Sequence, residues 1–248
     1  MNKLELTRFK SLDYACKEAI NTLCTNLTFS GMDKRRIMIT SCSAHEGKSF
    51  ITINLMRTFA KLGHKVILVD SDLRRSQISA KYGMNIIEGS GYGLSHYLAG
   101  MCSLEEVVYE TDIPGAYMIP VGYEVSNSLS LLSGTRFQEL FRKLEGDYEY
   151  VLVDAPPVGV IIDAAEIAKH CDGTVFVVKY NTTSRKELDE AKRQIERTGC
   201  PILGAVLNDV AFDTLSSKKY YNKNYYANYE SEYYNKANQK KKRTAQAK

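Results

Sequence analysis

Short apolar runs alternate with amphipathic stretches along most of the chain. Residues 66–70 form a continuous apolar run that ends in Asp70, which is typical of a parallel strand buried on both faces. From residue 49 to residue 62 apolar positions instead recur every three or four residues, which predicts a helix that ends before Gly63. The same reasoning predicts further strands at 36–40, 117–120, 150–154, 173–179 and 202–207, and further helices at 94–98, 135–144, 164–169 and 186–197.

The alternation of predicted strands and helices defines the fold class. It indicates an α/β protein with a doubly wound, mostly parallel sheet whose functional site lies at the carboxyl edge of the strands. At 248 residues the chain is long enough for one large α/β domain, which we place at residues 35–213. Residues 1–34 are expected to form a helical lead-in, and residues 214–248 a separate tail.

The predicted tail differs in composition from the rest of the chain. Seven of the 17 tyrosines fall within residues 220–234, with no large aliphatic residue among them, which favours a disordered or weakly ordered segment. From Lys218 to Lys248, nine Lys or Arg face two Glu, a net charge of +7. With a formal net charge of +4, the preceding residues therefore carry about −3. A basic tail suits an anionic membrane surface or a nucleic acid, or serves only as a solvated end.

Cysteine usage and hydropathy indicate the cellular compartment in which we expect the protein. The six cysteines include no CxxC pair and no Cys/His cluster at zinc spacing, which favours reduced thiols in the cytosol. The start of the chain lacks the apolar core of a signal peptide, and no stretch reaches the about 20 apolar residues of a membrane span. We therefore expect a soluble protein whose membrane association comes from a partner.

A candidate phosphate-binding loop joins the first predicted strand to the first predicted helix of the domain. Residues 41–49 end in the Gly-Lys-Ser of a P-loop, in which backbone N–H groups and a lysine bind phosphates and a hydroxyl binds Mg²⁺. Cys42 replaces the usual first glycine of the pattern, so the assignment depends on the strand–loop–helix context. The predicted ATP-binding residues of this segment are Ser43, Ala44, His45, Glu46, Gly47, Lys48, Ser49 and Phe50.

Three aspartates follow predicted strands and complete the candidate site. Asp70 and Asp72 follow one strand and Asp154 ends another, and parallel strands bring these ends to the edge that carries the P-loop. Mg²⁺ takes only one or two carboxylates and keeps several waters, so one aspartate remains to accept a proton. Each acid alone is more often a solvated strand-end residue or a helix cap, whereas the three together with Gly-Lys-Ser indicate a catalytic centre.

In this order, GKS, ILVDSDLR and VLVDAPP resemble the Walker A, A′ and B motifs of the bacterial tyrosine kinases that control capsule and exopolysaccharide assembly. The resemblance extends from Glu18 to the tyrosine-rich end, and residues 158–164 resemble the Gram-positive members. It implies a protein-tyrosine kinase of P-loop NTPase fold that uses ATP and Mg²⁺ and phosphorylates its own tail in trans. The implied phosphoacceptors are Tyr220, Tyr221, Tyr225, Tyr226, Tyr229, Tyr233 and Tyr234.

The resemblance also implies a role for each site residue. Lys48 is implied to bind the β- and γ-phosphates, and Asp70 to activate the incoming tyrosine hydroxyl. Arg74 is implied to support the A′ segment or to contact the phosphates, and Asn208 either contacts the base or is a simple turn residue. The implied metal ligands are Ser49, Asp72 and Asp154, and the implied catalytic residues are Lys48, Asp70 and Asp72.

Partners and location follow from the same resemblance. It implies a membrane adaptor of the polysaccharide co-polymerase type, which recruits the cytoplasmic kinase to the inner face of the plasma membrane. It also implies a homo-oligomer, joined by the N-terminal helix, in which the tail of one subunit docks in its neighbour's site. A cognate tyrosine phosphatase completes the set, and no nucleic acid is expected.

Two regions depart from the family pattern. Where the family loop often has glycine, this chain has His45, which costs about 1 kcal/mol if the position needs a positive φ. In the N-terminal helix the family carries ExxRxxRTN, but here only Glu18 and the Thr-Asn pair are kept. The two arginines are replaced by Asn21 and Cys24, so their charge-assisted contacts between subunits are lost.

Two alternative functions remain open at this point. A positioning or partitioning ATPase of the same P-loop class carries a lysine five residues before the P-loop lysine, where this chain has Ser43. A nucleotide-binding regulatory module would use its Lys- and Tyr-rich tail to bind nucleic acid or a membrane. A steep salt dependence of RNA binding that is unaffected by Lys48→Met would favour the second alternative.

Overall fold

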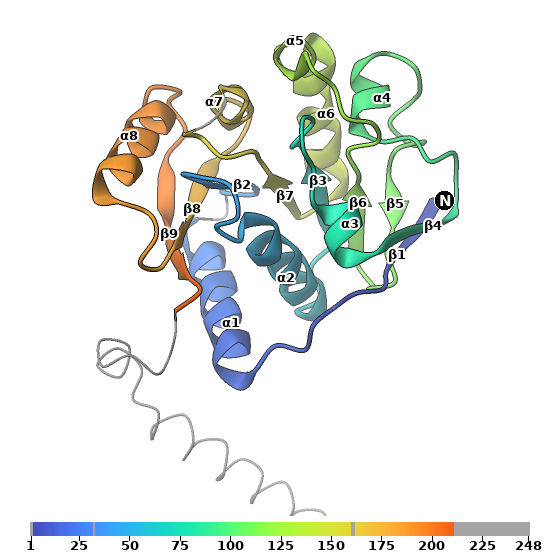
Figure 1. Ribbon diagram of the computed structural model, residues 1–248. Helices are drawn as coiled ribbons and strands as arrows, with labels where there is room; N and C mark the ends of the chain where they lie inside the picture. The colour runs from blue at the N-terminus through green and yellow to red at the C-terminus, as the bar shows by residue number, and fades with distance from the viewer. Residues whose placement is uncertain (1, 32, 160–161, 211–248) are drawn as a thin grey trace, which may run out of the picture. The chain divides into compact units, whose positions relative to one another are not determined.

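The computed structural model describes residues 2–31, 33–159 and 162–210 (Figure 1). By its internal contacts the chain divides into two units, Met1–Asn208 and Asp209–Lys248. The helices and strands given below belong to the first unit. The predictions of a tail at 214–248, of its disorder and of its seven phosphoacceptor tyrosines lie outside the described residues.

Among the described residues, nine strands form one sheet in the order β4-β1-β5-β6-β3-β7-β2-β8-β9. Neighbouring strands are parallel except in the β1–β4 and β5–β6 pairs. The mostly parallel sheet predicted from the sequence is therefore confirmed. The strands are β1 (Asn2–Leu6), β2 (Arg36–Ser41), β3 (Val66–Asp70), β4 (Met84–Glu88), β5 (Tyr109–Glu110), β6 (Ala116–Ile119), β7 (Tyr150–Asp154), β8 (Gly173–Lys179) and β9 (Ile202–Asn208).

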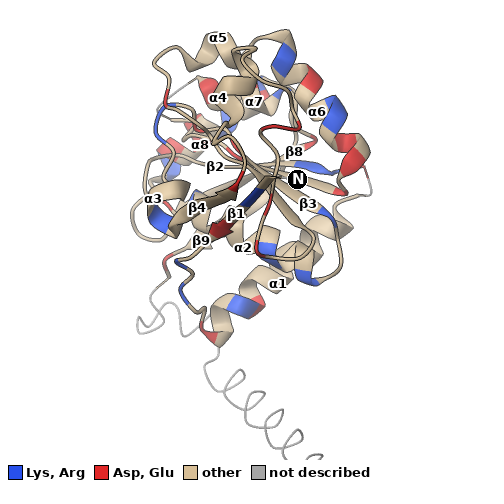
Figure 2. Cartoon of the chain, turned by 90° about the vertical axis from the view of Figure 1, so that its right-hand side faces the viewer, with Lys and Arg blue, Asp and Glu red and all other residues tan. Residues whose placement is uncertain are grey.

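Helices cover both faces of the sheet, as a doubly wound fold requires (Figure 1). One face carries α1 (Tyr14–Phe29), α2 (Lys48–Lys61) and α3 (Ile78–Tyr82). The other carries α4 (Leu94–Leu98), α5 (Ser128–Leu132), α6 (Thr135–Asp147), α7 (Asp163–Ala168) and α8 (Arg185–Glu196). Figure 2 shows charged residues mainly on the helices and loops, with α6 carrying both signs, while the central strands are largely uncharged.

The central strands explain why their apolar runs are continuous. On β3, Val66 and Leu68 pack into the cluster beneath α1 and α2, whereas Ile67 and Val69 pack into the cluster beneath α4–α8. All four side chains are fully buried. Because successive side chains point to opposite faces and both faces are covered, all four of these positions are apolar.

The N-terminal segment differs from the prediction. The sequence predicts a helical lead-in over residues 1–34, but Asn2–Leu6 is strand β1 of the sheet, paired with β4 and β5. Leu4 and Leu6 are buried and alternate with the polar Lys3 and Glu5, so a period of two was present in the sequence. The expected helix then follows as α1, where the Asp13 side chain accepts a hydrogen bond from the Cys16 N–H at 2.7 Å.

The other predicted strands and helices are present within a few residues of their predicted bounds, and all six cysteines are free thiols. The short elements α3, β4, β5 and α5 are not predicted by the sequence pattern. Within residues 2–31, 33–159 and 162–210, no helix has the length and apolar character needed to cross a membrane.

Candidate active site

The three central strands bring the predicted motifs together at their carboxyl ends. β7 lies between β2 and β3, and Asp70 at the end of β3 pairs in register with Asp154 at the end of β7. The loop after β2 leads directly into α2, which begins at Lys48. The predicted P-loop, A′ and B segments therefore meet at one edge of the sheet, as expected for parallel strands.

Two residues at the end of the P-loop have a positive φ. Gly47 caps α2 with φ 99°, and a Cβ atom at this position would lie 2.0 Å from the Asn208 amide nitrogen, so only glycine fits. His45 also has a positive φ, 63°, which meets the condition under which a histidine here costs about 1 kcal/mol. The first N–H groups of α2 have no helical acceptor and are free to bind an anion.

Glu46 stabilises the P-loop through hydrogen bonds of its side chain and its carbonyl group. Its side chain is buried and its carboxylate accepts hydrogen bonds from the Ser43 N–H at 2.9 Å and from the Thr183 hydroxyl. Its carbonyl oxygen accepts the Asn208 side-chain amide at 2.9 Å. The carboxylate of Glu46 and the amide of Asn208 thus brace the loop, and a contact between Asn208 and a base stays a prediction. Thr183, in the loop before α8, has no motif around it and was not identified from the sequence.

The first turn of α2 faces the B-motif aspartate. The Ser49 hydroxyl donates to Asp154 Oδ2 at 2.6 Å and the Thr52 hydroxyl lies 3.2 Å from Asp154 Oδ1. The Lys48 ammonium lies 3.4 Å from Asp72 Oδ2. Thr52 is a further site residue missed in the sequence, where its place one turn after Lys48 on the same helix was the available signal.

The other residues predicted for this segment differ in how exposed they are. Ala44 and His45 are exposed at the tip of the loop, and Ser43 is half-buried. The Phe50 ring packs against the core cluster beneath α2. A contact of Phe50 with ATP would therefore involve its backbone N–H, and it stays a prediction.

The site concentrates negative charge that has been removed from water. Asp70, Asp72 and Asp154 are 2%, 5% and 1% exposed. Burial, followed by the neighbouring Asp154 carboxylate, raises the pKa of Asp70 well above its usual range, and burial likewise raises the pKa of Asp154. Burial opposes the charge of Lys48, but the three carboxylates together raise its pKa. An added cation would lower the electrostatic cost of this arrangement.

The two carboxylate oxygens of Asp70 differ in their hydrogen bonding. Ser76 donates a hydrogen bond to Asp70 Oδ2, whereas Asp70 Oδ1 is buried with no hydrogen-bond partner among the described residues. No group of three or more His, Cys, Asp or Glu in the described part of the chain could bind a metal unaided. The donor set nevertheless fits Mg²⁺, which binds through one or two carboxylates, a hydroxyl, waters and substrate phosphates.

Arg74 is paired with Asp163 and with the backbone before α5. Its Nε lies 2.9 Å from Asp163 Oδ2 and its Nη1 donates to the carbonyl of Ser126 at 3.1 Å. These contacts are compatible with support of the A′ segment, and both that role and phosphate contact stay predictions. Asp163 was part of the recognised run after Walker B, but its pairing with Arg74 depends on tertiary structure and was not predicted.

A P-loop between a strand and a helix, followed by buried aspartates on two neighbouring strands, defines a nucleotide-binding P-loop protein. Comparison with known proteins is consistent with this class. The family described as "AAA domain" matches residues 35–198. The tyrosine-protein kinase CpsD of Streptococcus pneumoniae is 32% identical over 231 residues, which cover 92% of this chain and 99% of that protein.

Solved structures support the same assignment. The kinase domain of Escherichia coli tyrosine kinase ETK matches with a TM-score of 0.75 and 28% identity, covering 84% of each chain. The septum site-determining protein MinD of Pyrococcus horikoshii, complexed with Mg-ADP, matches with a TM-score of 0.60 and 25% identity, covering 70% of this chain and 69% of that one. The chain belongs to the bacterial tyrosine-protein kinases. The enzyme class predicted from the sequence is thereby confirmed.

Proposed function

We propose that this kinase uses ATP and Mg²⁺ to phosphorylate tyrosines of its own C-terminal segment and thereby regulates capsule or exopolysaccharide assembly. The observation that carries the proposal is Asp70, a buried carboxylate whose Oδ1 has no hydrogen-bond partner among the described residues, at the strand edge that carries the P-loop. An acceptor hydroxyl needs such a base within reach of the phosphate that it attacks.

The loop and α2 supply phosphate binding in this proposal. Backbone N–H groups of Gly47, Lys48 and Ser49 bind the phosphates, and the Lys48 ammonium binds the β- and γ-phosphate oxygens. Ser49, Asp72 and Asp154 are the residues that would hold Mg²⁺. Mg²⁺, when bound, neutralises charge on the phosphate oxygens. The presence of Mg-ADP in the MinD relative supports this choice of nucleotide and metal.

Asp70 performs the proton transfer. The phenol oxygen of the acceptor tyrosine attacks the γ-phosphorus and its proton passes to Asp70 Oδ1. The bond between the γ-phosphorus and the bridging oxygen breaks, and ADP leaves with that electron pair. Oδ2 already accepts the Ser76 hydroxyl, whereas Oδ1 has no hydrogen-bond partner among the described residues. Oδ1 is therefore the oxygen that accepts the proton.

The acceptors in the proposal are the seven tyrosines of residues 220–234. Each phosphate adds about −1.5 to −2 charges, so several of them reverse the tail's net charge of +7. Charge reversal next to a subunit joint favours dissociation, which links phosphorylation to an assembly cycle. A membrane adaptor of the co-polymerase type and a cognate tyrosine phosphatase complete the proposed cycle.

The direct test is intact-mass and phosphopeptide analysis of the full chain with MgATP, with and without the cytoplasmic segment of the adaptor. Wild type should gain phosphate on residues 220–234, and Lys48→Met should gain none. Nucleotide binding without any phosphotyrosine, even with the adaptor present, would overturn the proposal and favour a P-loop ATPase.

Transfer between subunits needs a separate experiment. Full-length Lys48→Met, which keeps all acceptors, is mixed with a full-length chain whose seven tail tyrosines are replaced by phenylalanine. Phosphate on the Lys48→Met chain would show transfer in trans. If neither chain in the mixture gains phosphate while wild type does, transfer occurs within one chain.

A further inference from the structure

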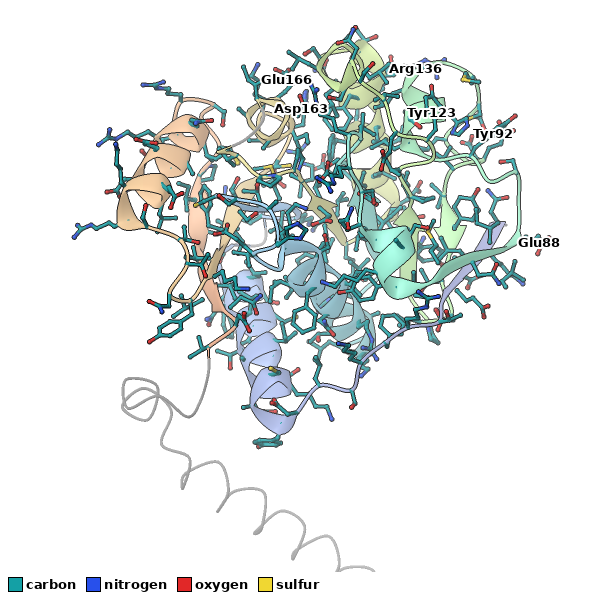
Figure 3. All side chains as sticks on the ribbon, viewed as in Figure 1. Glu88, Tyr92, Tyr123, Arg136, Asp163 and Glu166 are labelled. Carbon is teal, nitrogen blue, oxygen red and sulfur yellow. The ribbon has the colours of Figure 1, made fainter. Side chains whose placement is uncertain are left out.

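Asp163 is a buried acid that the proposed chemistry does not use. It is the first residue of α7 and its exposed fraction is 1%. Its carboxylate accepts Arg74 Nε at 2.9 Å, Arg74 Nη2 at 3.4 Å and the Ser128 hydroxyl. Figure 3 shows Asp163 and Glu166 together on α7. A carboxylate this deeply buried is stable only when such donors compensate its lost hydration.

The segment after β6 is joined to the A′ motif at the same place. The Val125 N–H donates to the Leu73 carbonyl at 2.9 Å, and Arg74 Nη1 donates to the Ser126 carbonyl at 3.1 Å. Ser128, at the start of α5, reaches Asp163 itself. Three segments far apart in the sequence, at 73–74, 125–128 and 163, therefore meet around one carboxylate.

The A′ turn is fastened at both ends, with Asp72 between them. At the near end the Ser71 N–H and hydroxyl donate to the Asp154 carbonyl at 3.0 and 2.8 Å. At the far end Arg74 is held by Asp163. Between the two, Asp72 lies 3.4 Å from the Lys48 ammonium. Without the Arg74–Asp163 pair, the far end would keep backbone hydrogen bonds, from the Val125 N–H to the Leu73 carbonyl and from the Arg75 N–H to Asp72 Oδ1 at 3.1 Å.

We propose that Asp163 is a positioning residue for phosphoryl transfer, which acts through Arg74 to fix the direction of Asp72 toward Lys48 and the metal. The inference rests on the proposed function, because that function gives Asp72 its role at Mg²⁺. It assigns the segment 125–128 as the brace that closes this junction. A displacement of a catalytic group by about 1 Å costs up to about 100-fold in rate.

The test compares Asp163→Asn with Glu166→Gln in the full-length chain. Glu166 is an acid on the same helix, paired with Lys169 at 2.7 Å on the surface, so it is a matched control. Asp163→Asn should lower kcat about 10- to 100-fold and raise the half-saturating Mg²⁺ concentration several-fold. Affinity for ATP measured in EDTA should stay within about threefold, because the P-loop is untouched. Glu166→Gln should match wild type in all three.

A double-mutant cycle of Asp163→Asn and Arg74→Gln distinguishes a positioning role from general destabilisation of the fold. If both residues act through one ion pair, the double variant should be no slower than the slower single variant. Ser128→Ala keeps the carboxylate and loses one donor, so it should fold and show the same changes at about two- to threefold. Wild-type kcat and Mg²⁺ dependence in Asp163→Asn, or fully additive effects in the cycle, would overturn the inference.

Failure of the proposed function is distinguishable from failure of this inference. If wild type transfers no phosphate, the proposed function fails, whereas the junction is still measured by the gain in nucleotide affinity that Mg²⁺ produces. That gain should be smaller in Asp163→Asn than in wild type and Glu166→Gln. An equal gain in all three would contradict the positioning role without reference to turnover.

Discussion

The two edges of the same sheet differ in how their acidic side chains are compensated by donors. At the amino edge, where β2 and β8 begin, Asp172 accepts Arg36 Nε at 3.1 Å and the backbone N–H groups of Arg35 and Arg36 at 3.1 and 2.8 Å. At the carboxyl edge, three buried aspartates share one ammonium group, and one oxygen of Asp70 has no partner among the described residues. The first arrangement is compensated and the second is not.

The pKa shifts express this difference. Burial alone would raise the pKa of Asp172, but hydrogen bonds from Arg36 lower it below its usual value. Burial and neighbouring carboxylates instead raise the pKa of Asp70 and Asp154. The ionised acid at the amino edge therefore stabilises the fold. The ionised acids at the carboxyl edge destabilise the nucleotide-free fold, and a bound nucleotide and cation would compensate their charge.

The largest expected effect is the loss of activity when the Lys48 ammonium is removed. Lys48→Met should lower phosphotransfer by about 100- to 1000-fold, because the Lys48 ammonium is paired with Asp72 and is the group proposed to bind the β- and γ-phosphates. Initial rates with radiolabelled ATP measure this loss. A rate within tenfold of wild type would show that the lysine does not bind the reacting phosphates.

Removal of the Asp172 carboxylate should destabilise the fold and leave the rate of phosphotransfer unchanged. Asp172→Ala is expected to lower the free energy of unfolding by about 2–4 kcal/mol, because a partly buried guanidinium and two backbone N–H groups lose their acceptor. Urea denaturation of the nucleotide-free protein measures this change. An unchanged midpoint would mean that water replaces the carboxylate at no cost.

The two edges also predict opposite pH dependences. The pKa of Asp172 is lowered by folding, so its contribution to stability is present above about pH 4 and is lost as the pH falls further. The pKa of Asp70 and of Asp154 is raised by folding, so the nucleotide-free protein should lose stability as the pH rises from about 4 toward neutrality. Thermal melts between about pH 5 and pH 8 should show a negative slope that Mg-ADP reduces. A positive slope in this range would contradict the assignment.

The smallest expected effect is at the strained residue of the P-loop. His45→Gly relieves a positive φ worth about 1 kcal/mol, but glycine loses more backbone entropy on folding by about the same amount. The free energy of unfolding should therefore change by less than about 1 kcal/mol, and nucleotide affinity should be kept. His45→Val is the contrasting variant, which should destabilise the loop because a β-branched residue tolerates this conformation poorly.

The sequence predicted the parts of the molecule whose signal is local. Val66–Asp70 and Tyr150–Asp154 were identifiable because both faces of these strands are buried, and Gly47 because its turn admits no other residue. Short elements such as β5 and α3 carry too few residues for a period to show. β1 had an alternating pattern that the expectation of a helical lead-in obscured.

Tertiary contacts explain what the sequence could not show at the site. Arg74 and Asp163 are 89 positions apart and Glu46 and Thr183 are 137 apart, so neither pair has a spacing that a motif records. Asn208 was identified as a site residue, but its amide braces the P-loop carbonyl of Glu46. The residue types were predictable there, whereas their partners depended on the order of strands in the sheet.

The stability of Asp70→Asn without nucleotide tests the central claim most directly. Asparagine keeps the size of the side chain and removes one of the crowded charges. The melting temperature at neutral pH should rise by about 2–4 °C, which corresponds to about 1 kcal/mol, while phosphotransfer is lost. A melting temperature at or below that of wild type would contradict the account, because the carboxyl edge would then be no less compensated than the amino edge.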